Sequence, residues 1–309
     1  MLAGKKTKVG IAVPQMFPYG PVDMGFVEKH LRLVESLGYD SVWTQDSVLG
    51  TMDTLDPFTL LAYASTVTEK VDLGISVLVM PFQNPVHLAK ISASLDQLSK
   101  GRLILGVGIG GHEGKYPAFG FDAQHRVTRF EDSVELVKRL WTEPRVTFKD
   151  RFWDLQNVSI NPKPLRSPRP PIWFGAHAKP ALERAVRIGD GWMGAGSSTT
   201  RAFKGAIGHI RSYMDETGRD PGTFPLGKRI YIAIDNDKER AARRLEEWFD
   251  GYYHNASWAR KVAVFGPEEE VIDGLGQILE EEPDMIMFNP VFDLIEHAER
   301  LAGDIVPKL

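Results

Sequence analysis

The chain has 309 residues, a formal net charge of −4, 43% hydrophobic and 25% charged residues, and no cysteine. This composition is typical of a soluble globular enzyme, and the slightly acidic balance disfavours nucleic acid and anionic membranes as partners. The lack of cysteine excludes disulfides, thiolate catalysis and zinc–thiolate sites. Because no apolar run reaches membrane-spanning length and no signal-peptide pattern is present, we expect a cytoplasmic protein with a single domain, 1–309.

Apolar runs and helical periods alternate along the chain. Short apolar runs bounded by turn residues predict eight strands, at 8–13, 39–43, 73–79, 103–105, 172–174, 191–194, 229–234 and 285–288. Between them, helical periodicity and start signals such as Asp56–Pro57 and Asn84–Pro85 predict helices. These helices are expected at 24–37, 57–67, 85–100, 126–141, 179–188, 200–217, 237–249, 268–280 and 291–302.

Alternation of this kind defines an α/β protein. Eight strand–helix units in one chain favour a (β/α)₈ TIM barrel over a doubly wound sheet. The repeat is broken at 142–171, where two apolar segments flank Lys149–Asp150–Arg151 and five prolines follow. We expect a β-hairpin and a proline-rich connector there, as an insertion into the barrel. The residues just after each strand are then the candidates for a site.

The glycines of 106–111 match the G-x-G-x-x-G pattern of dinucleotide sites. That fingerprint needs a helix that begins at its last glycine, so that the helix N-terminus can hold a pyrophosphate. Here 112–117 is a poor helix start. A nicotinamide-dependent dehydrogenase on a doubly wound fold is therefore the alternative function, and a helix beginning at Gly111 would favour it.

Three glycine-rich segments that follow strands favour a flat, phosphate-bearing cofactor instead. Glycine lets a ring of the isoalloxazine kind approach the backbone without interference from Cβ atoms. The three segments are 106–111, 175–177 and 194–198. The last has small residues, two hydroxyls and a helix from Thr200, whose N-terminus favours a phosphate.

Titratable side chains after the strands are candidates for proton transfer. Asp46, His112 and His177 are the catalytic candidates, and His177 could equally be an ordinary loop histidine. Asp46 and His112 could also bind a metal, but no close spacing of histidines and carboxylates supports a metal site. Ser47 and Ser198 lack the context of a nucleophile elbow, which argues against a serine hydrolase.

Several stretches occur together in one order along the chain. They are Leu37–Trp43, Leu98–Gly111, Arg129–Glu131, Pro170–Gly175 and Gly189–Trp192. Together they resemble the luciferase-like monooxygenase superfamily, which comprises flavin-dependent monooxygenases and, as close relatives, oxidoreductases that use coenzyme F-420. The resemblance covers about residues 8 to 200, and beyond that only the strand rhythm and 285–290 match. It implies a barrel with an insertion and a cofactor, FMN or coenzyme F-420, across the mouth.

The resemblance also implies the positions of site residues. Ser76–Val77 matches the place where the family often has a non-prolyl cis peptide behind the cofactor ring. Residues 108–113 would line the ring, and 175–177 and 194–197 would hold the ribityl phosphate region. The implied cofactor-binding residues are Ser76, Val77, Gly108, Gly110, Glu113, Gly175, Ala176, His177, Gly194, Ala195, Gly196 and Ser197.

Two departures from the family pattern bear on function. Many relatives carry Asp-His after the second strand, whereas this chain has Asp46–Ser47, so proton transfer would use His112, His177 or no group. The missing histidine also favours a second alternative, a flavin-binding protein without catalysis. Relatives that use the deazaflavin can place a lysine near the phosphate, and 194–200 contains none, which favours FMN.

These observations predict an oxidoreductase that acts on a small organic substrate. It would use reduced FMN and O₂ as a monooxygenase, or transfer a hydride with coenzyme F-420. Aromatic residues in the least patterned segments favour an apolar or aromatic substrate; they are Tyr19, Tyr252, Tyr253 and Trp258. A homodimer is compatible with the sequence.

Overall fold

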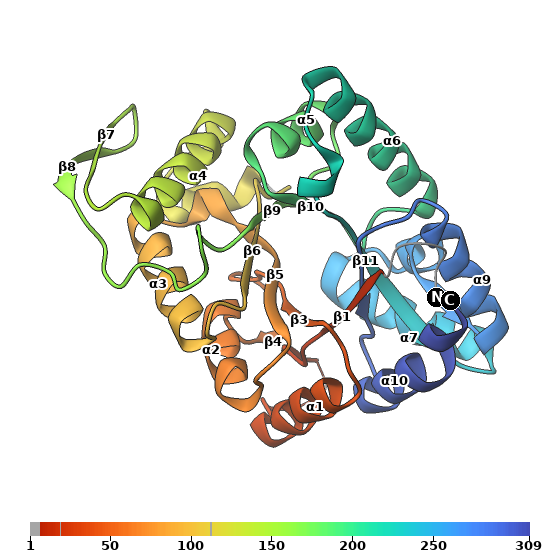
Figure 1. Ribbon diagram of the computed structural model, residues 1–309. Coiled ribbons are helices and arrows are strands. Elements are labelled where there is room, and N and C mark those ends of the chain that lie inside the picture. Colours follow the sequence, from red (N-terminus) through yellow and green to blue (C-terminus); the bar gives the residue numbers. More distant parts are fainter. Residues whose placement is uncertain (1–6, 19, 112) are drawn as a thin grey trace.

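The fold is a closed parallel barrel. The computed structural model describes residues 7–18, 20–111 and 113–309, and in this part eight parallel strands form a ring surrounded by helices (Figure 1). In order around the ring they are β1 (Lys8–Ala12), β3 (Ser41–Thr44), β5 (Asp72–Val79), β6 (Leu103–Gly108), β9 (Ile172–Phe174), β10 (Gly191–Gly194), β11 (Leu226–Ile234) and β13 (Met285–Asn289). Pairing of β1 with β13 closes the ring. This confirms the (β/α)₈ barrel and rejects the doubly wound sheet.

Helices cover the outside of the barrel. They are α1 (Met24–Ser36), α2 (Pro57–Val67), α3 (Pro85–Leu98), α4 (Arg126–Thr142), α5 (Lys179–Ile188), α6 (Thr200–Thr217), α7 (Lys238–Tyr253), α8 (Ala259–Val262), α9 (Glu268–Leu279) and α10 (Leu294–Arg300). The predicted start signals are confirmed. Asp56 accepts a hydrogen bond from Thr59 N–H at 2.8 Å, and Asn84 accepts one from Val86 N–H at 3.0 Å. Each cap satisfies an amide that the helix itself leaves without a partner.

The predicted insertion is present. Strands β7 (Val146–Lys149) and β8 (Asp154–Val158) form an antiparallel hairpin, which projects from the ring at the left of Figure 1. The proline-rich connector that follows contains cis peptide bonds at Asn161–Pro162 and Ser167–Pro168. The connector returns the chain to β9.

Some elements near the carboxyl ends of the strands depart from the prediction. A small antiparallel pair, β2 (Met16–Phe17) with β4 (Asp53–Thr54), was not predicted. The segment 251–265, which the sequence suggested to be irregular, contains the end of α7, helix α8 and part of β12 (Val264–Gly266). Strand β12 pairs with the last residues of β11, and this extends β11 beyond the ring of the barrel.

Aspartates fasten neighbouring strands at the amino-terminal end of the barrel. Each precedes one strand and accepts a hydrogen bond from the start of the neighbouring strand that comes earlier in the chain. The bonds run from Val9 N–H to Asp40, from Ile172 N–H to Asp190 and from Leu226 N–H to Asp284, each 2.8 Å long. This explains why aspartate precedes β3, β10 and β13. At this end of a barrel such residues serve stability.

Arg102 also lies at the amino-terminal end of the barrel, between α2 and β6. It is 9% exposed, and all five of its N–H groups donate hydrogen bonds. Nε donates to Ser99 O, Nη1 to Thr68 Oγ1 and Val71 O, and Nη2 to Ser65 O and Thr68 O, at 2.7–3.2 Å. Arg102 therefore binds the carbonyls at the carboxyl end of α2, where a positive charge is favourable.

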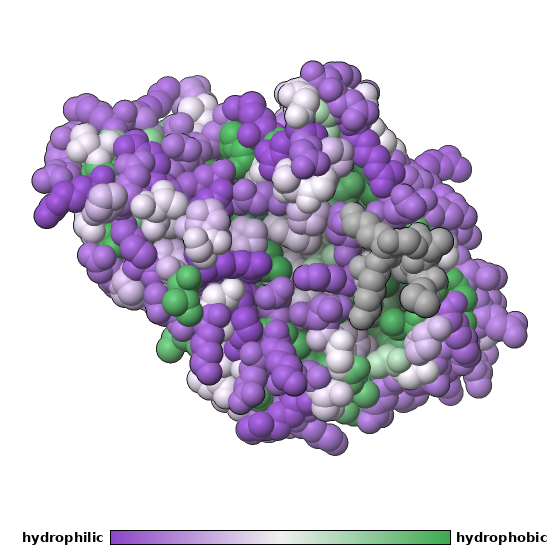
Figure 2. Space-filling model, viewed as in Figure 1, coloured by the Kyte–Doolittle hydropathy of each residue, from purple (hydrophilic) through white to green (hydrophobic). Residues whose placement is uncertain are grey.

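The face of the molecule drawn in Figure 2 is largely polar. Hydrophilic side chains dominate the face in Figure 2, and the hydrophobic patches on it are small and scattered. Among the described residues, no helix is long and apolar enough to span a bilayer.

Candidate active site

A bulge in β5 shapes the mouth of the barrel, at the carboxyl ends of the strands. The Ser76–Val77 peptide bond is cis, as the family resemblance implied. The pairing of β5 with β6 shifts register between Ile75 and Leu78, so Ser76 and Val77 bulge out of the ladder. Backbone groups of the bulge are thereby left for other partners.

The glycines around the mouth make room for this bulge. A Cβ atom at Gly106 would lie 1.9 Å from Ile75 O, which no side chain could tolerate. A Cβ atom at Gly108 would lie 2.9 Å from Val77 Cγ2, and one at Gly175 would lie 3.0 Å from the Val77 methyl groups. Packing of the bulge thus accounts for glycines that the sequence analysis explained by close approach of a cofactor ring.

The loop after β6 does not resemble a dinucleotide site. In its described part, Gly111 is followed by a 3₁₀ segment, Glu113–Phe119, and the next α-helix begins at Arg126. The nicotinamide alternative required a helix beginning at Gly111 and is therefore wrong. His112, a catalytic candidate, lies outside the described residues.

The loop after β10 leads into the amino terminus of α6. Ser198 N–H donates to Ala195 O at 3.1 Å, and the Thr199 hydroxyl caps the helix by accepting from Ala202 N–H at 3.2 Å. Arg201 stands exposed in the first turn. The helix has 18 residues, and its dipole favours an anion at the loop. The positive charge of Arg201 favours an anion there as well.

Lys228 lies beneath this loop and was missed by the sequence analysis. It comes from β11, is 2% exposed, and its ammonium donates to Ala195 O at 2.6 Å, Ser198 O at 2.9 Å and Ser198 Oγ at 2.8 Å. Burial, with a smaller contribution from the neighbouring Arg229 charge, lowers the pKa of Lys228 to about 7. The sequence of the loop at 194–200 contains no pattern that indicates a contact with Lys228, because Lys228 is distant from this loop along the chain.

Arg229, the next residue of β11, joins the barrel interior to the bulge. It is 7% exposed and its guanidinium spans three elements. Nε donates to Asn289 Oδ1 at 2.9 Å, Nη1 to Ser76 O at 3.3 Å and Nη2 to Tyr231 Oη at 2.9 Å. In the sequence, Arg229 stands at the start of a predicted strand, and no pattern there indicates a role at the site.

Asp46 stands beside the bulge at the end of β3. Its Oδ2 accepts a hydrogen bond from Val79 N–H at 2.9 Å, while Oδ1 is buried and has no hydrogen-bond partner among the described residues. Burial raises the pKa of Asp46 above its ordinary value, although the bond from Val79 opposes this. His177, by contrast, is exposed on the loop after β9. Of the candidate acids that the structure describes, Asp46 has the more perturbed environment.

Aromatic side chains from β11 and α7 form one wall of the mouth. Tyr231 Oη and Tyr253 Oη are 2.9 Å apart, and Trp248 stacks on Tyr252 with ring centroids 5.0 Å apart. Trp258 completes this aromatic wall by contact with Tyr253. The structure thus gathers three of the four aromatic residues that suggested an apolar substrate, and Tyr19 lies outside the described residues.

A cavity opens beside the aromatic wall. The cavity itself has a volume of about 40 Å³, and together with the adjoining space open to solvent the empty volume is about 440 Å³. It is lined by 12–16, 43–45, 289–291, Arg229, Trp248, Met287 and Leu294. Arg229 is the one charged residue among these lining residues. No group of three or more potential metal ligands occurs in the described parts of the chain.

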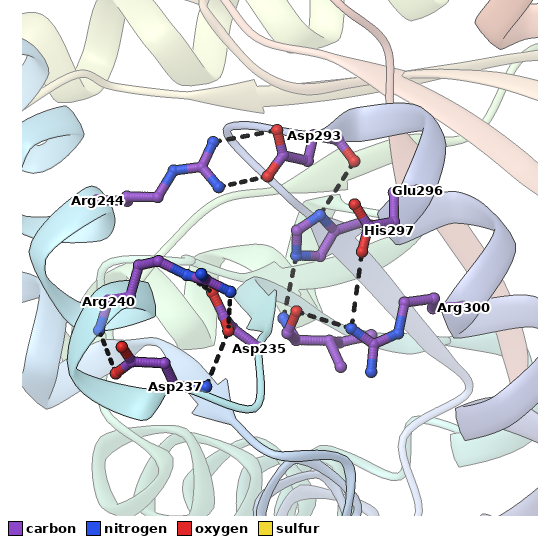
Figure 3. A network of polar contacts seen from close by, with 9 residues as sticks. Asp235, Asp237, Arg240, Arg244, Asp293, Glu296, His297 and Arg300 are labelled. Carbon is purple, nitrogen blue, oxygen red and sulfur yellow. Dashed lines mark hydrogen bonds and ion pairs between the residues drawn. The ribbon is translucent and has the colours of Figure 1, made fainter.

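Ion pairs of α7 hold the helix that carries most of the aromatic wall. Arg240 of α7 binds both carboxylate oxygens of Asp235 at 2.7 Å, and Arg244 of α7 binds both oxygens of Asp293 (Figure 3). Asp235 follows β11 and Asp293 precedes α10. Paired N–H···O contacts of this kind fix the relative orientation of the two side chains. They therefore hold α7 against the end of β11 and the start of α10.

His297 of α10 joins the same network (Figure 3). Its Nε2 accepts a hydrogen bond from Ile234 N–H at 3.0 Å, and its Nδ1 lies 3.0 Å from Asp293 O. Arg300 donates to Ile234 O at 3.0 Å. Burial lowers the pKa of His297, in keeping with a neutral ring that accepts at Nε2.

Comparison with known proteins identifies the family. The chain matches the luciferase-like monooxygenase family over residues 8–296. It is 29% identical over 222 residues to the F420-dependent glucose-6-phosphate dehydrogenase of Kineococcus radiotolerans, covering 69% of this chain and 65% of that protein. It is 30% identical over 169 residues to the phthiodiolone/phenolphthiodiolone dimycocerosates ketoreductase of Mycobacterium kansasii, covering 54% and 46%. These matches span about half to two thirds of the curated relatives.

Solved structures share the whole fold. The monooxygenase RslO1 from Streptomyces bottropensis superposes with a TM-score of 0.80 at 26% identity, covering 97% of this chain and 99% of that one. An F420-dependent secondary alcohol dehydrogenase superposes with a TM-score of 0.84 at 20% identity, covering 98% and 99%. With the family match over most of its length, the chain belongs to the luciferase-like monooxygenase family.

Proposed function

We propose that the protein is an oxidoreductase that binds coenzyme F-420 or FMN across the barrel mouth and acts on a small organic substrate. The observation that carries this proposal is the Ser76–Val77 bulge, whose Ser76 carbonyl accepts a hydrogen bond from Arg229, a residue that lines the cavity. When bound, coenzyme F-420 exchanges a hydride with the substrate, whereas reduced FMN supplies electrons for oxygenation by O₂. Both chemistries need a site that orients the ring and excludes water.

The residues at the mouth fit such a cofactor. The Ser76–Val77 bulge, Gly108 and Gly110 would support the ring, and Glu113 begins the segment beside it. Residues 175–177 would lie along the ribityl chain. The segment Gly194–Ser197 and the amino terminus of α6 would hold the phosphate, as the dipole of a long helix favours.

Coenzyme F-420 is the favoured cofactor. The F420-dependent glucose-6-phosphate dehydrogenase is 29% identical to this chain over 222 residues. The absence of lysine from 194–200 favoured FMN, but Lys228 places an ammonium directly beneath that loop. Oxygenation with FMN is the second candidate, and the 26% identity to the monooxygenase RslO1 supports it.

Asp46 is the proton-transfer group of the proposed site. Its buried Oδ1 has no hydrogen-bond partner among the described residues, which supports a role for Asp46 beyond packing. Since burial raises its pKa, Asp46 retains its proton to a higher pH than an exposed aspartate does. As an acid it would support turnover below its pKa, and turnover would fall as pH rises through that value.

A titration with both cofactors tests the proposal. We expect coenzyme F-420 to give a saturable change in its absorbance and to stabilise the protein by about 2.7 kcal/mol at a hundredfold excess over Kd. Riboflavin, which lacks the phosphate, should bind more weakly than FMN if 194–198 holds that group. Absence of binding by both cofactors would refute the proposal, and binding without turnover of any substrate would favour the non-catalytic alternative.

A further inference from the structure

The cavity at the mouth has an unusual charge balance. Arg229 is buried, and a guanidinium does not lose its proton in proteins. Its three hydrogen-bond acceptors are an amide oxygen, a backbone carbonyl and a phenol, all of them neutral. No carboxylate of the described residues forms an ion pair with it. Burial of a charge without a counter-charge is unfavourable, which indicates a role in ligand binding.

Its hydrogen bonds leave donors available. The guanidinium carries five N–H groups, and only three donate to partners in the part of the chain that the structure describes. Arg229 is also the one charged residue that lines the cavity. Gln15, a polar neighbour there, is already engaged with the backbone of Gln45 and Leu55. Arg229 is therefore the group in this cavity best suited to an anion.

We propose that Arg229 binds the anionic group of the substrate, and that the substrate carries a carboxylate or another small oxyanion on an apolar or aromatic body. The remaining N–H groups of a guanidinium match the two oxygens of such a group. Trp43, Trp248 and Met287 line the same cavity and would contact the body. The proposal specifies the substrate class of the oxidoreductase proposed above and rests on that function.

A purely structural role is the competing explanation, since Arg229 also links the bulge to β13 through Asn289. Arg219 provides a matched control. It donates to Val186 O at 2.8 Å and Gly189 O at 3.1 Å, and its guanidinium lies 5.2 Å from the centroid of the Phe224 ring. Arg229 similarly lies 5.0 Å from the centroid of the Tyr231 ring. Only Arg229 lines the cavity.

The test is a calorimetric titration of the cofactor-free protein with benzoate and with its neutral isostere benzamide. We expect benzoate to bind at least about tenfold more tightly than benzamide. Arg229→Met should abolish this preference, Arg229→Lys should retain part of it because the charge remains, and Arg219→Met should leave it intact. If Arg229→Met does not fold, two other measurements test the proposal. They are the preference of the unmodified protein for benzoate over benzamide and the reduction of that preference in Arg229→Lys.

Three results would overturn the proposal: equal binding of the two ligands, binding of neither, or an unchanged preference in Arg229→Met. A fourth result would also overturn it, by showing that Arg229 binds an anionic cofactor and not an anionic substrate. In that case Arg229→Met would weaken the binding of reduced FMN more than that of oxidised FMN, while the binding of benzoate would be unchanged. The cofactor titration of the unmodified protein is a separate readout. A failure there refutes the proposed function, whereas the benzoate preference tests Arg229 alone.

Discussion

Two buried arginines at opposite ends of the barrel show how differently the ends are built. Arg102 at the amino-terminal end donates all five of its N–H groups and has Glu35, Glu69 and Asp72 near enough to stabilise its charge. Arg229 at the mouth donates three and has no ion pair with a described carboxylate. The two arginines are similarly buried but unequally paired, as expected if the first serves stability and the second binds the ligand proposed above.

The largest expected effect tests the stabilising end. Arg102→Met should lower the free energy of unfolding by about 3–5 kcal/mol, because it leaves buried carbonyls and nearby carboxylates without their cation. Urea unfolding measures the loss, and coenzyme F-420 should still bind to the folded fraction. Arg229→Met should cost less, since no ion pair is lost. A greater loss in Arg229→Met than in Arg102→Met would reverse the comparison.

A glycine substitution tests the packing of the bulge. Gly106→Ala should destabilise the protein by about 3 kcal/mol, because the new Cβ would overlap the Ile75 carbonyl oxygen. Gly111→Ala is the matched control, since nothing lies within 4 Å of a Cβ atom at that position. Thermal unfolding of the two variants measures the difference. Equal melting temperatures would show that the bulge is not held as described.

The unpaired carboxyl oxygen at the mouth should matter for turnover rather than for stability. Asp46→Asn should lower kcat by about a hundredfold, the range of general acid catalysis, with the affinity for the cofactor unchanged. Asp53→Asn, at an exposed position of β4, is the control. In the unmodified enzyme kcat should fall as pH rises through the elevated pKa of Asp46. An Asp46→Asn enzyme with the same kcat and the same pH profile would exclude this role.

Buried histidines away from the mouth should affect stability through pH. Burial lowers the pKa of His30 to about 3 and also lowers that of His297, whereas the unfolded chain takes up these protons near pH 6.5. The stability contributed by the neutral rings is therefore complete above that pH. It decreases as pH falls below about 6.5, by about 1.4 kcal/mol per pH unit for His30, and the lowered pKa of His297 acts in the same direction.

Urea midpoints at about pH 7.5 and about pH 5.5 measure this slope. His30→Met should remove the contribution of His30 and leave that of His297. A slope unchanged by His30→Met would contradict the assignment.

The sequence predicts the strands and helices of the barrel well, because each of these elements depends on residues that are close together in the chain. Strand–helix alternation, the caps at Asp56 and Asn84 and the hairpin of the insertion all depend on neighbouring residues, and the structure confirms them. The cis Ser76–Val77 bond followed from the family resemblance. Asp46 could be selected because it lies in the loop after a predicted strand.

The polar groups at the mouth could not be predicted in the same way. Lys228 and Arg229 are adjacent, yet one contacts the loop after β10 and the other the bulge of β5. Their directions depend on the register of β11 between β10 and β13, which local patterns do not reveal. The glycine at 106 was likewise explained by a ligand, whereas its nearest neighbour is the Ile75 carbonyl, placed there by the bulge.

The most direct test of the contrast between the two ends follows both arginines in one experiment. Buried arginine Nε–H groups can be assigned by ¹⁵N NMR with Arg102→Lys and Arg229→Lys as references. On addition of coenzyme F-420 and then benzoate, we predict that the Arg229 signal shifts with saturation while the Arg102 signal stays in place. An unchanged Arg229 signal at saturating ligand, or equal shifts of both signals, would contradict the account.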